Sequence, residues 1–300
     1  MKVFPNAKIN LGLAIVRKRP DGYHDLETIF LPVPGLHDEL EITPSPSFSF
    51  TREGLTVDCP AEDNLIIRTY LRTKEAFPDK VGPVNIRFRK NIPFGAGLGG
   101  GSADAAFTLV ALNRLFDLGL TPEQMERFIS PLGADCAFFI QNRPRFAEGI
   151  GDIFSEVPES VLDQLRGKWL LLVKPDCAVS TRDAYRGIQP RESQHATENP
   201  PHNSSPRVGD VSRSDGEVRN TPLINNSKLT INISSLTNDF ESTVFPLYPE
   251  IAAVKQQILD QGAFYAAMSG SGATVFGLFD HLPDTAPFGT LFTHVEKLDY

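Results

Sequence analysis

The 300-residue chain has little of what several protein classes require. Its three cysteines, Cys59, Cys136 and Cys177, are too few and too widely spaced for a disulfide framework or a zinc site. A net charge of −8 excludes a global basic field for nucleic acid, so any anion must be bound locally. No apolar run approaches the roughly 18 residues of a membrane span, and the first residues hold no apolar signal-peptide core. We therefore expect a cytoplasmic protein that binds neither nucleic acid nor membrane.

The chain also lacks the signatures of two large classes of nucleotide-binding protein. No G-x-x-x-x-G-K-[ST] segment occurs, which excludes a P-loop. Neither H-R-D nor D-F-G is present, which excludes a protein kinase. The length and the 41% of hydrophobic residues are sufficient for one large domain or two ordinary ones with a substantial core.

The most informative segment is a glycine-rich stretch from Pro93 to Ala106. Five glycines fall between positions 95 and 101, where bare backbone N–H groups can approach a bulky anion. A helix-like run follows, for which we expect Ser102 as the N-cap and Gly119 as the stop. Free N–H donors and a partial positive charge at a helix N-terminus favour phosphate. A tight turn with close helix packing is the alternative, but so many glycines at a helix start favour the phosphate site.

The residues before the glycines indicate which type of phosphate-binding loop the sequence predicts. Residues 95–100 fit the dinucleotide pattern G-x-G-x-x-G, which is weak by itself. A dinucleotide loop directly follows a buried parallel strand. Here residues 84–89 alternate between apolar and polar, as in a half-exposed antiparallel strand, and Pro93 separates them from the glycines. A dinucleotide-binding domain is therefore disfavoured.

The pattern P-x-x-x-G-L-G followed by small residues resembles the second motif of the GHMP kinases, which include galactokinase, homoserine kinase and mevalonate kinase. The variant G-L-G-G-G-S-A-D-A-A is most similar to the branch that phosphorylates the 2-hydroxyl of 4-diphosphocytidyl-2-C-methyl-D-erythritol in the non-mevalonate isoprenoid pathway. The resemblance covers most of residues 4–185 and 238–279. It implies ATP as phosphoryl donor, Mg²⁺ and a small-molecule substrate. We expect a monomer or a weak homodimer.

Two further segments imply the catalytic pair. The alternation after Lys8 predicts a strand with Ile9 and Leu11 on one face, and with Lys8 and Asn10 on a face left open for a ligand. Asp135 lies among small and apolar residues, where a carboxylate must be paired, capping or functional. The segments A-K-I-N-L and G-A-D resemble family motifs. That resemblance implies Asp135 as catalytic base, Lys8 as its partner near the transferred phosphate, and Asn10 near the substrate.

Two aromatic segments imply recognition of cytidine. Tyr23 and His24 follow a strong turn signal, Pro-Asp-Gly, on an expected surface loop. From the residues alone, surface packing is the simpler interpretation. However, R-x-D-G-Y-H and the segment containing Thr181 and Tyr185 resemble the parts of this branch that contact cytosine. We expect Tyr185 to face Tyr23 across the base.

The remaining binding residues are also implied by the resemblance. The segment M-S-G-S-G-A-T resembles the family's third motif, in which Ser269 and Gly270 lie beside the phosphate loop and contact the substrate. Many relatives have two serines where this chain has glycine, so Ser102 is the nearest hydroxyl for Mg²⁺. The residues expected to bind ATP are Asn64, Lys90, Pro93, Phe94, Gly95, Ala96, Gly97, Leu98, Gly99, Gly100, Gly101, Ser102 and Ala103, with Lys90 and Phe94 flanking the adenine.

The architecture implied is α+β in two domains. Residues 1–155 would form an N-terminal domain with a mixed sheet and the glycine-rich loop, and residues 156–300 a smaller antiparallel sheet with helices. We also expect a hairpin over residues 48–57 and a disordered insert over 188–222, which has few hydrophobic residues. Two rival functions are another kinase of the same family, acting on homoserine or mevalonate, and a catalytically silent nucleotide-binding regulator.

Overall fold

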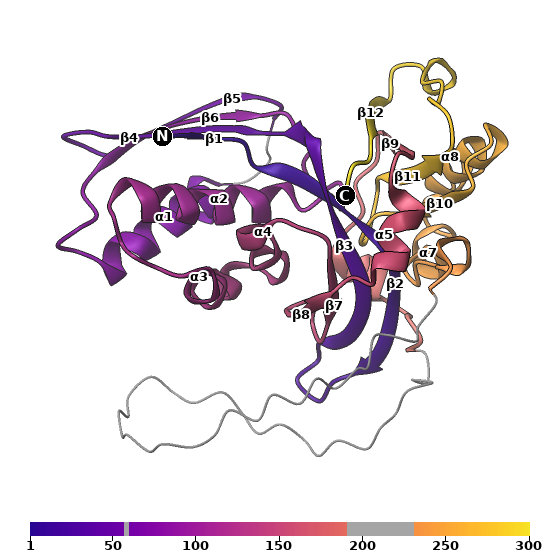
Figure 1. Ribbon diagram of the computed structural model, residues 1–300, viewed down its shortest axis with the longest axis horizontal. Helices are drawn as coiled ribbons and strands as arrows, with labels where there is room; N and C mark the ends of the chain where they lie inside the picture. The colour runs from indigo at the N-terminus through magenta and orange to yellow at the C-terminus, as the bar shows by residue number, and fades with distance from the viewer. Residues whose placement is uncertain (57–59, 191–230) are drawn as a thin grey trace.

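The computed structural model describes residues 1–56, 60–190 and 231–300. In these residues the strands form three four-stranded sheets (Figure 1). The expected insert, 188–222, lies outside the described residues except for its first three positions, where Ile188 is buried in the core. No helix of the described part of the chain has the length and hydropathy needed to cross a bilayer.

The first sheet is mixed, with strand order β1-β4-β6-β5. The central strand β6 pairs antiparallel with β4 and parallel with β5, because β5 and β6 are joined by a helical crossover. The hairpin expected over residues 48–57 is therefore wrong, whereas the alternating strand at 84–89 is confirmed. The strands are β1 (Lys2–Val3), β4 (Glu39–Pro44), β5 (Ser49–Gly54) and β6 (Val84–Lys90).

Helices cover the inner face of this sheet (Figure 1). The Asn64 side chain caps α1 by accepting from the backbone N–H of Ile66, and Thr121 forms a capping box on α3. The expected N-cap of the next helix is wrong, since α2 begins two residues before Ser102 and its N-cap is Gly99, with left-handed φ. The helices are α1 (Leu65–Ala76), α2 (Gly100–Leu115), α3 (Pro122–Ile129) and α4 (Phe138–Gln141).

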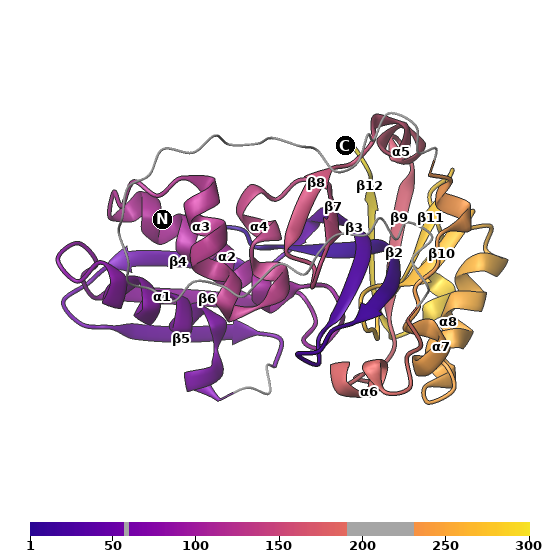
Figure 2. The ribbon, with the colours of Figure 1, turned by 90° about the horizontal axis from the view of Figure 1, so that it is seen from below.

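The second sheet is built on a long antiparallel hairpin that runs between the two halves of the molecule (Figures 1 and 2). Its strand order is β2-β3-β7-β8. Ile9 and Leu11 join the same hydrophobic core as residues of the C-terminal sheet, so this hairpin connects the halves. The strands are β2 (Asn6–Lys18), β3 (His24–His37), β7 (Arg145–Glu148) and β8 (Ile153–Glu156).

The third sheet is fully antiparallel, with order β10-β11-β9-β12 and helices α7 and α8 on one side (Figure 2). The α+β class, with a mixed sheet in the first half and an antiparallel sheet in the second, is confirmed. The elements are β9 (Trp169–Lys174), β10 (Tyr265–Met268), β11 (Val275–Phe279), β12 (Phe292–Lys297), α5 (Glu159–Leu165), α6 (Thr181–Tyr185), α7 (Glu241–Val244) and α8 (Pro249–Asp260).

Candidate active site

Lys8 and Asp135 form an ion pair between the first long strand and a short 3-10 helix, η3 (Ala134–Cys136). The Lys8 Nζ lies 3.2 Å from Asp135 Oδ2 and donates to Asn10 Oδ1 at 2.6 Å. It also lies 5.1 Å from the centre of the Phe30 ring. The Lys8 side chain is 4% exposed and that of Asp135 is 29% exposed, so a ligand can reach the carboxylate of the pair.

The strand face that carries Lys8 and Asn10 is not open, contrary to expectation. Both residues are buried, and Asn10 Nδ2 donates to Thr28 Oγ1 at 3.1 Å. The start of α2 covers the face closely, because a Cβ at Gly99 would come within 3.0 Å of Lys8 and of Phe139. The lysine is therefore held rigidly behind the carboxylate.

In the glycine-rich loop, left-handed glycines alternate with buried anchors. Gly95, Gly97 and Gly99 have φ values of 64°, 74° and 69°, a region that side chains disfavour. Ala96 and Leu98 between them are buried, and the Leu98 carbonyl accepts from the Lys8 N–H at 2.9 Å. The loop is thus fixed to the strand that carries the ion pair and leads directly into the N-terminus of α2.

The third motif lies against this loop, as the resemblance implies. We refer to residues 269–274 as the second glycine loop. Ser269 Oγ donates to the Gly97 carbonyl at 3.0 Å, and the Thr274 N–H donates to the Ala96 carbonyl at 3.2 Å. A Cβ at Gly270 would lie 3.3 Å from Asn10 Oδ1. Three segments far apart in the sequence therefore meet beside the Lys8 side chain.

Lys90 is placed differently from the prediction. Its ammonium is buried beneath the start of α2, 2.9 Å from where a Cβ at Gly100 would lie. It pairs with Asp38 Oδ2 at 2.5 Å and with Asp104 Oδ2 at 3.1 Å. Burial raises the pKa of Asp104 well above its usual range, although Lys90 opposes the shift. The Lys90 side chain cannot flank a bound base without leaving two buried carboxyl groups, so this expectation is corrected.

The aromatic pair also differs from the prediction, in one of its two residues. The His24 ring stacks on Tyr185, with centroids 4.9 Å apart and planes 25° apart, whereas Tyr23 is 63% exposed. His24 is the first residue of β3, whereas Tyr23 lies in the connection before the strand. Burial raises the pKa of Tyr185, with a contribution from Asp135, and burial and Lys18 lower the pKa of His24. The ring that faces Tyr185 is therefore His24.

The other predicted residues are distributed around these groups. Phe94 is 51% exposed, next to the exposed Gly95, and Thr181 is an exposed residue at the start of α6. Ala103 is fully buried, so its side chain is not available to a ligand. Pro93, Gly101 and Ser102 are at least partly exposed. Ser102 hydrogen-bonds the buried thiol of Cys136, and burial raises the pKa of that thiol to about 12.

Sequence reasoning missed several residues that hold the site together. Thr28 fixes Asn10, and Asp38 and Asp104 neutralise Lys90. Asp104 carried a usable signal, since it is a carboxylate among alanines in a stretch expected to be a packed helix. The contact of Thr28 comes from strand pairing and has no local signal.

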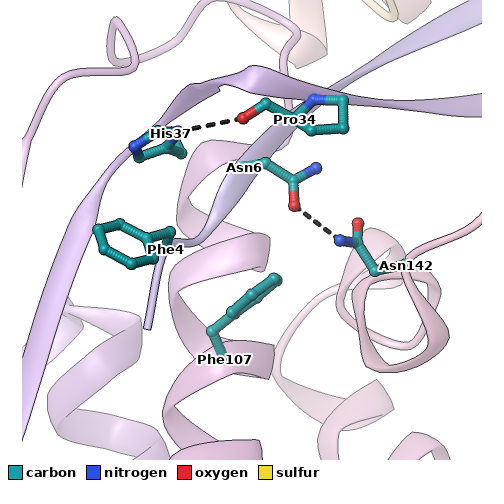
Figure 3. Close-up of a pocket in the computed structure, with 6 residues that line it drawn as sticks. All are labelled: Phe4, Asn6, Pro34, His37, Phe107 and Asn142. Carbon is teal, nitrogen blue, oxygen red and sulfur yellow. Dashed lines mark hydrogen bonds between the residues drawn. The ribbon is translucent and has the colours of Figure 1, made fainter. Parts of the chain in front are cut away.

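The described structure also has a pocket of about 380 Å³ (Figure 3). Its rim is mainly apolar, and the Asn142 amide donates to Asn6 Oδ1 at 2.7 Å on one side. None of its lining residues is a predicted site residue. The lining residues are Phe4, Asn6, Pro34, His37, Phe107 and Asn142.

The glycine-rich loop, the lysine–carboxylate pair and the fold define a small-molecule kinase of the GHMP class. The model of the GHMP kinase N-terminal domain matches residues 64–143, and that of the C-terminal domain matches residues 224–286. A homoserine kinase from Cytophaga hutchinsonii shares the fold, with a TM-score of 0.62 at 17% identity over 99% of this chain and 93% of the other.

More similar relatives define the branch. The chain is 48% identical to the 4-diphosphocytidyl-2-C-methyl-D-erythritol kinase of Bacteroides fragilis, over 93% of this chain and 92% of the relative. It is 45% identical to the kinase of that name from Cytophaga hutchinsonii, over 94% and 93%. A crystal structure of 4-(cytidine 5'-diphospho)-2C-methyl-D-erythritol kinase aligns with a TM-score of 0.66 and 28% identity, over 93% and 90%. The chain belongs to the 4-diphosphocytidyl-2-C-methyl-D-erythritol kinase family of GHMP kinases.

Proposed function

We propose that this protein transfers a phosphoryl group from ATP to the 2-hydroxyl of 4-diphosphocytidyl-2-C-methyl-D-erythritol, a step of the non-mevalonate isoprenoid pathway. The observation that carries the proposal is the Lys8–Asp135 pair beside the glycine-rich loop, in a chain whose near full-length relatives bear this activity in their names. Phosphoryl transfer depends mainly on positioning and charge stabilisation, and a rigid pair of opposite charges supports both.

Asp135 and Lys8 would have different roles in the reaction. Asp135 would accept the proton of the attacking hydroxyl, because its carboxylate is the reachable member of the pair. Lys8 would stabilise the charge that develops on the transferred group. Its ammonium is fixed by Asn10 and by the Phe30 ring, so it needs little rearrangement during the reaction.

The glycine-rich loop would hold the phosphates of ATP at the N-terminus of α2, and the exposed Phe94 would contact the base. Among the described residues no group of three or more His, Cys, Asp or Glu side chains could hold a metal ion. Mg²⁺ commonly keeps water and substrate phosphates as ligands, and Ser102 would be the nearest protein hydroxyl to it. When bound, Mg²⁺ would supply positive charge that offsets the negative charge of the phosphates.

The cytosine would be recognised between the two halves of the chain. His24 and Tyr185 supply a stacked aromatic pair, and Thr181 begins the helix that carries Tyr185. Gly270 lies beside Asn10, and its neighbour Ser269 bonds the Gly97 carbonyl. We divide the protein into an N-terminal domain, 1–155, and a C-terminal domain, 156–300, and propose that it acts in the cytoplasm as a monomer or weak homodimer.

A side-by-side assay tests this function. ATP-dependent phosphorylation with Mg²⁺ is measured on 4-diphosphocytidyl-2-C-methyl-D-erythritol, homoserine and mevalonate. We expect turnover of the cytidylated substrate alone; turnover of another would retain the phosphate chemistry and contradict the cytidine recognition. Binding of ATP without any turnover would indicate a regulator.

The Asp135→Asn variant tests the base. It should retain ATP binding and lower kcat by about 100-fold or more, because general-base catalysis is lost. Near-normal turnover would contradict the role of Asp135.

A further inference from the structure

Residues 237–241, which lie between the two glycine loops in the sequence, have no role in the mechanism proposed above. They connect β2, the strand that carries Lys8, to the second glycine loop. Residues 237–241 run alongside β2, and Asn238 forms a parallel bridge with Leu13. The Leu13 N–H donates to the Thr237 carbonyl and the Asp239 N–H donates to the Leu13 carbonyl, both at 2.9 Å. The Ile15 N–H donates to Asp239 Oδ2 at 2.8 Å. This segment is therefore fixed to the strand that carries Lys8 and Asn10.

The Asn238 side chain reaches from this segment to the second glycine loop. It is 3% exposed, and its Nδ2 donates to the Met268 carbonyl at 2.7 Å and to the Gly270 carbonyl at 2.8 Å. Its Oδ1 accepts from the Phe240 N–H at 3.0 Å. Two acceptors on one side and a donor on the other fix the orientation of the amide. Asparagine is the smallest side chain that offers two N–H donors and a carbonyl acceptor at once.

Glu241 holds the residue directly before this loop, Met268, which is the last residue of β10. Its Oε1 accepts from the Met268 N–H at 2.8 Å, and its Oε2 pairs with Lys255 of α8 at 2.6 Å. The backbone of residue 268 is thus held at its N–H by Glu241 and at its carbonyl by Asn238. The start of the second glycine loop has little freedom to move away from β2.

The loop held in this way is the one that contacts the reaction centre. Ser269 Oγ donates to the Gly97 carbonyl, and Gly270 lies against Asn10, which in turn binds the Lys8 ammonium. A shift of the second glycine loop would therefore displace the phosphate loop and the lysine relative to Asp135. We propose that Asn238 is a positioning residue for phosphoryl transfer, acting through Gly270 and Ser269. This inference rests on the proposed kinase function.

The Asn238→Asp variant tests the inference. The change is isosteric and keeps the oxygen that accepts from Phe240, but it places a carboxylate oxygen against two carbonyls. We expect kcat to fall at least about tenfold with little change in either KM, because misplacement of about 1 Å can cost 100-fold in rate. Asn232→Asp is the matched control, since the exposed Asn232 also accepts a backbone N–H through its Oδ1.

A purely structural role would give a different result. It would lower the unfolding midpoint of Asn238→Asp while leaving the kcat of the folded enzyme, assayed well below that midpoint, within twofold of wild type. That result would overturn the proposal. If Asn238→Asp does not fold, Asn238→Ala removes the donor without adding an acceptor and should lower kcat in the same way. Absence of turnover by the wild-type protein would contradict the proposed function, whereas wild-type turnover with unimpaired Asn238 variants would contradict the positioning role alone.

Discussion

Lys90, buried beneath the start of α2, leads to the sharpest prediction. In Lys90→Met the ammonium is lost, and Asp38 and Asp104 remain, with side chains 0% and 7% exposed. Asp38 keeps the N–H groups of Asn91 and Ile92, but Asp104 Oδ1 has no hydrogen-bond partner even in the wild-type protein. Removal of one partner of a buried ion pair typically costs about 3–5 kcal/mol. We expect a loss of this size in the free energy of unfolding, measured with urea.

The pH dependence of this loss follows from the sign of the Asp104 shift. Its pKa is raised by burial, and Lys90 opposes the rise, so the variant should show a still higher pKa. A carboxyl group with a raised pKa binds more protons in the folded than in the unfolded state. Stability is then greatest below the unfolded pKa and is lost as the pH rises through the folded one. The deficit of Lys90→Met should accordingly grow as the pH rises above the raised pKa that Asp104 has in the folded wild-type protein.

Two further variants complete the test. In Lys90→Met/Asp104→Asn one of the uncompensated carboxyl groups is gone, so the double variant should be more stable than Lys90→Met at pH 8. Lys74→Met, at an exposed position of α1, is the control and should change stability by less than about 0.5 kcal/mol. A deficit of Lys90→Met below about 1 kcal/mol at pH 8, or one that does not vary with pH, would refute the reasoning. The variant should also raise the KM for ATP more than the KM for the cytidylated substrate.

Three other predictions follow from single residues. Gly97→Ala should raise the KM for ATP far more than Gly119→Ala. Both glycines have left-handed φ, but only at Gly97 would a Cβ come as close as 2.1 Å to a carbonyl oxygen, that of Ser269. Equal effects of the two substitutions on the KM for ATP would contradict this prediction. His24→Ala should raise the KM for the cytidylated substrate about tenfold without changing that for ATP, since stacking on a base is worth about 1–3 kcal/mol; an equal change in both would argue against base recognition. Cys136 should resist iodoacetamide at pH 8 until the protein unfolds, because its buried thiol has a pKa of about 12. Peptide mass spectrometry measures this, and rapid labelling of the folded protein would contradict it.

The sequence predicted correctly those elements that depend mainly on neighbouring residues. The alternation of residues 84–89 predicts β6, the Thr-Pro pair predicts the start of α3, and the apolar run at 169–173 predicts a buried strand. The glycine-rich stretch predicts a loop before a helix, because several consecutive glycines have few other uses. The proposed catalytic pair, Lys8 and Asp135, was inferred from motif resemblance, and the structure brings the two side chains within 3.2 Å.

Two of the wrong predictions concern the residue at which a helix or a strand begins. The helix after the loop starts at Gly100 and not after Ser102, because Gly99 can adopt the left-handed conformation without a side-chain cap. His24, not Tyr23, stacks on Tyr185, because β3 begins at His24 and Tyr23 stays exposed in the connection before it. The turn signal at residues 20–22 predicts the connection but not the residue at which the strand begins.

What the sequence by itself determined is the inventory of the proposed site: a glycine-rich loop, a lysine, a carboxylate and aromatic rings. What the tertiary structure alone decided is the partner of each group. Lys90 was assigned to a nucleotide but is neutralised by Asp38 and Asp104, which lie 52 and 14 positions away along the chain. Asn238 holds a loop about thirty positions further on. Such pairings follow from the burial of charges and polar groups in a common core, and burial is a property of the folded chain as a whole.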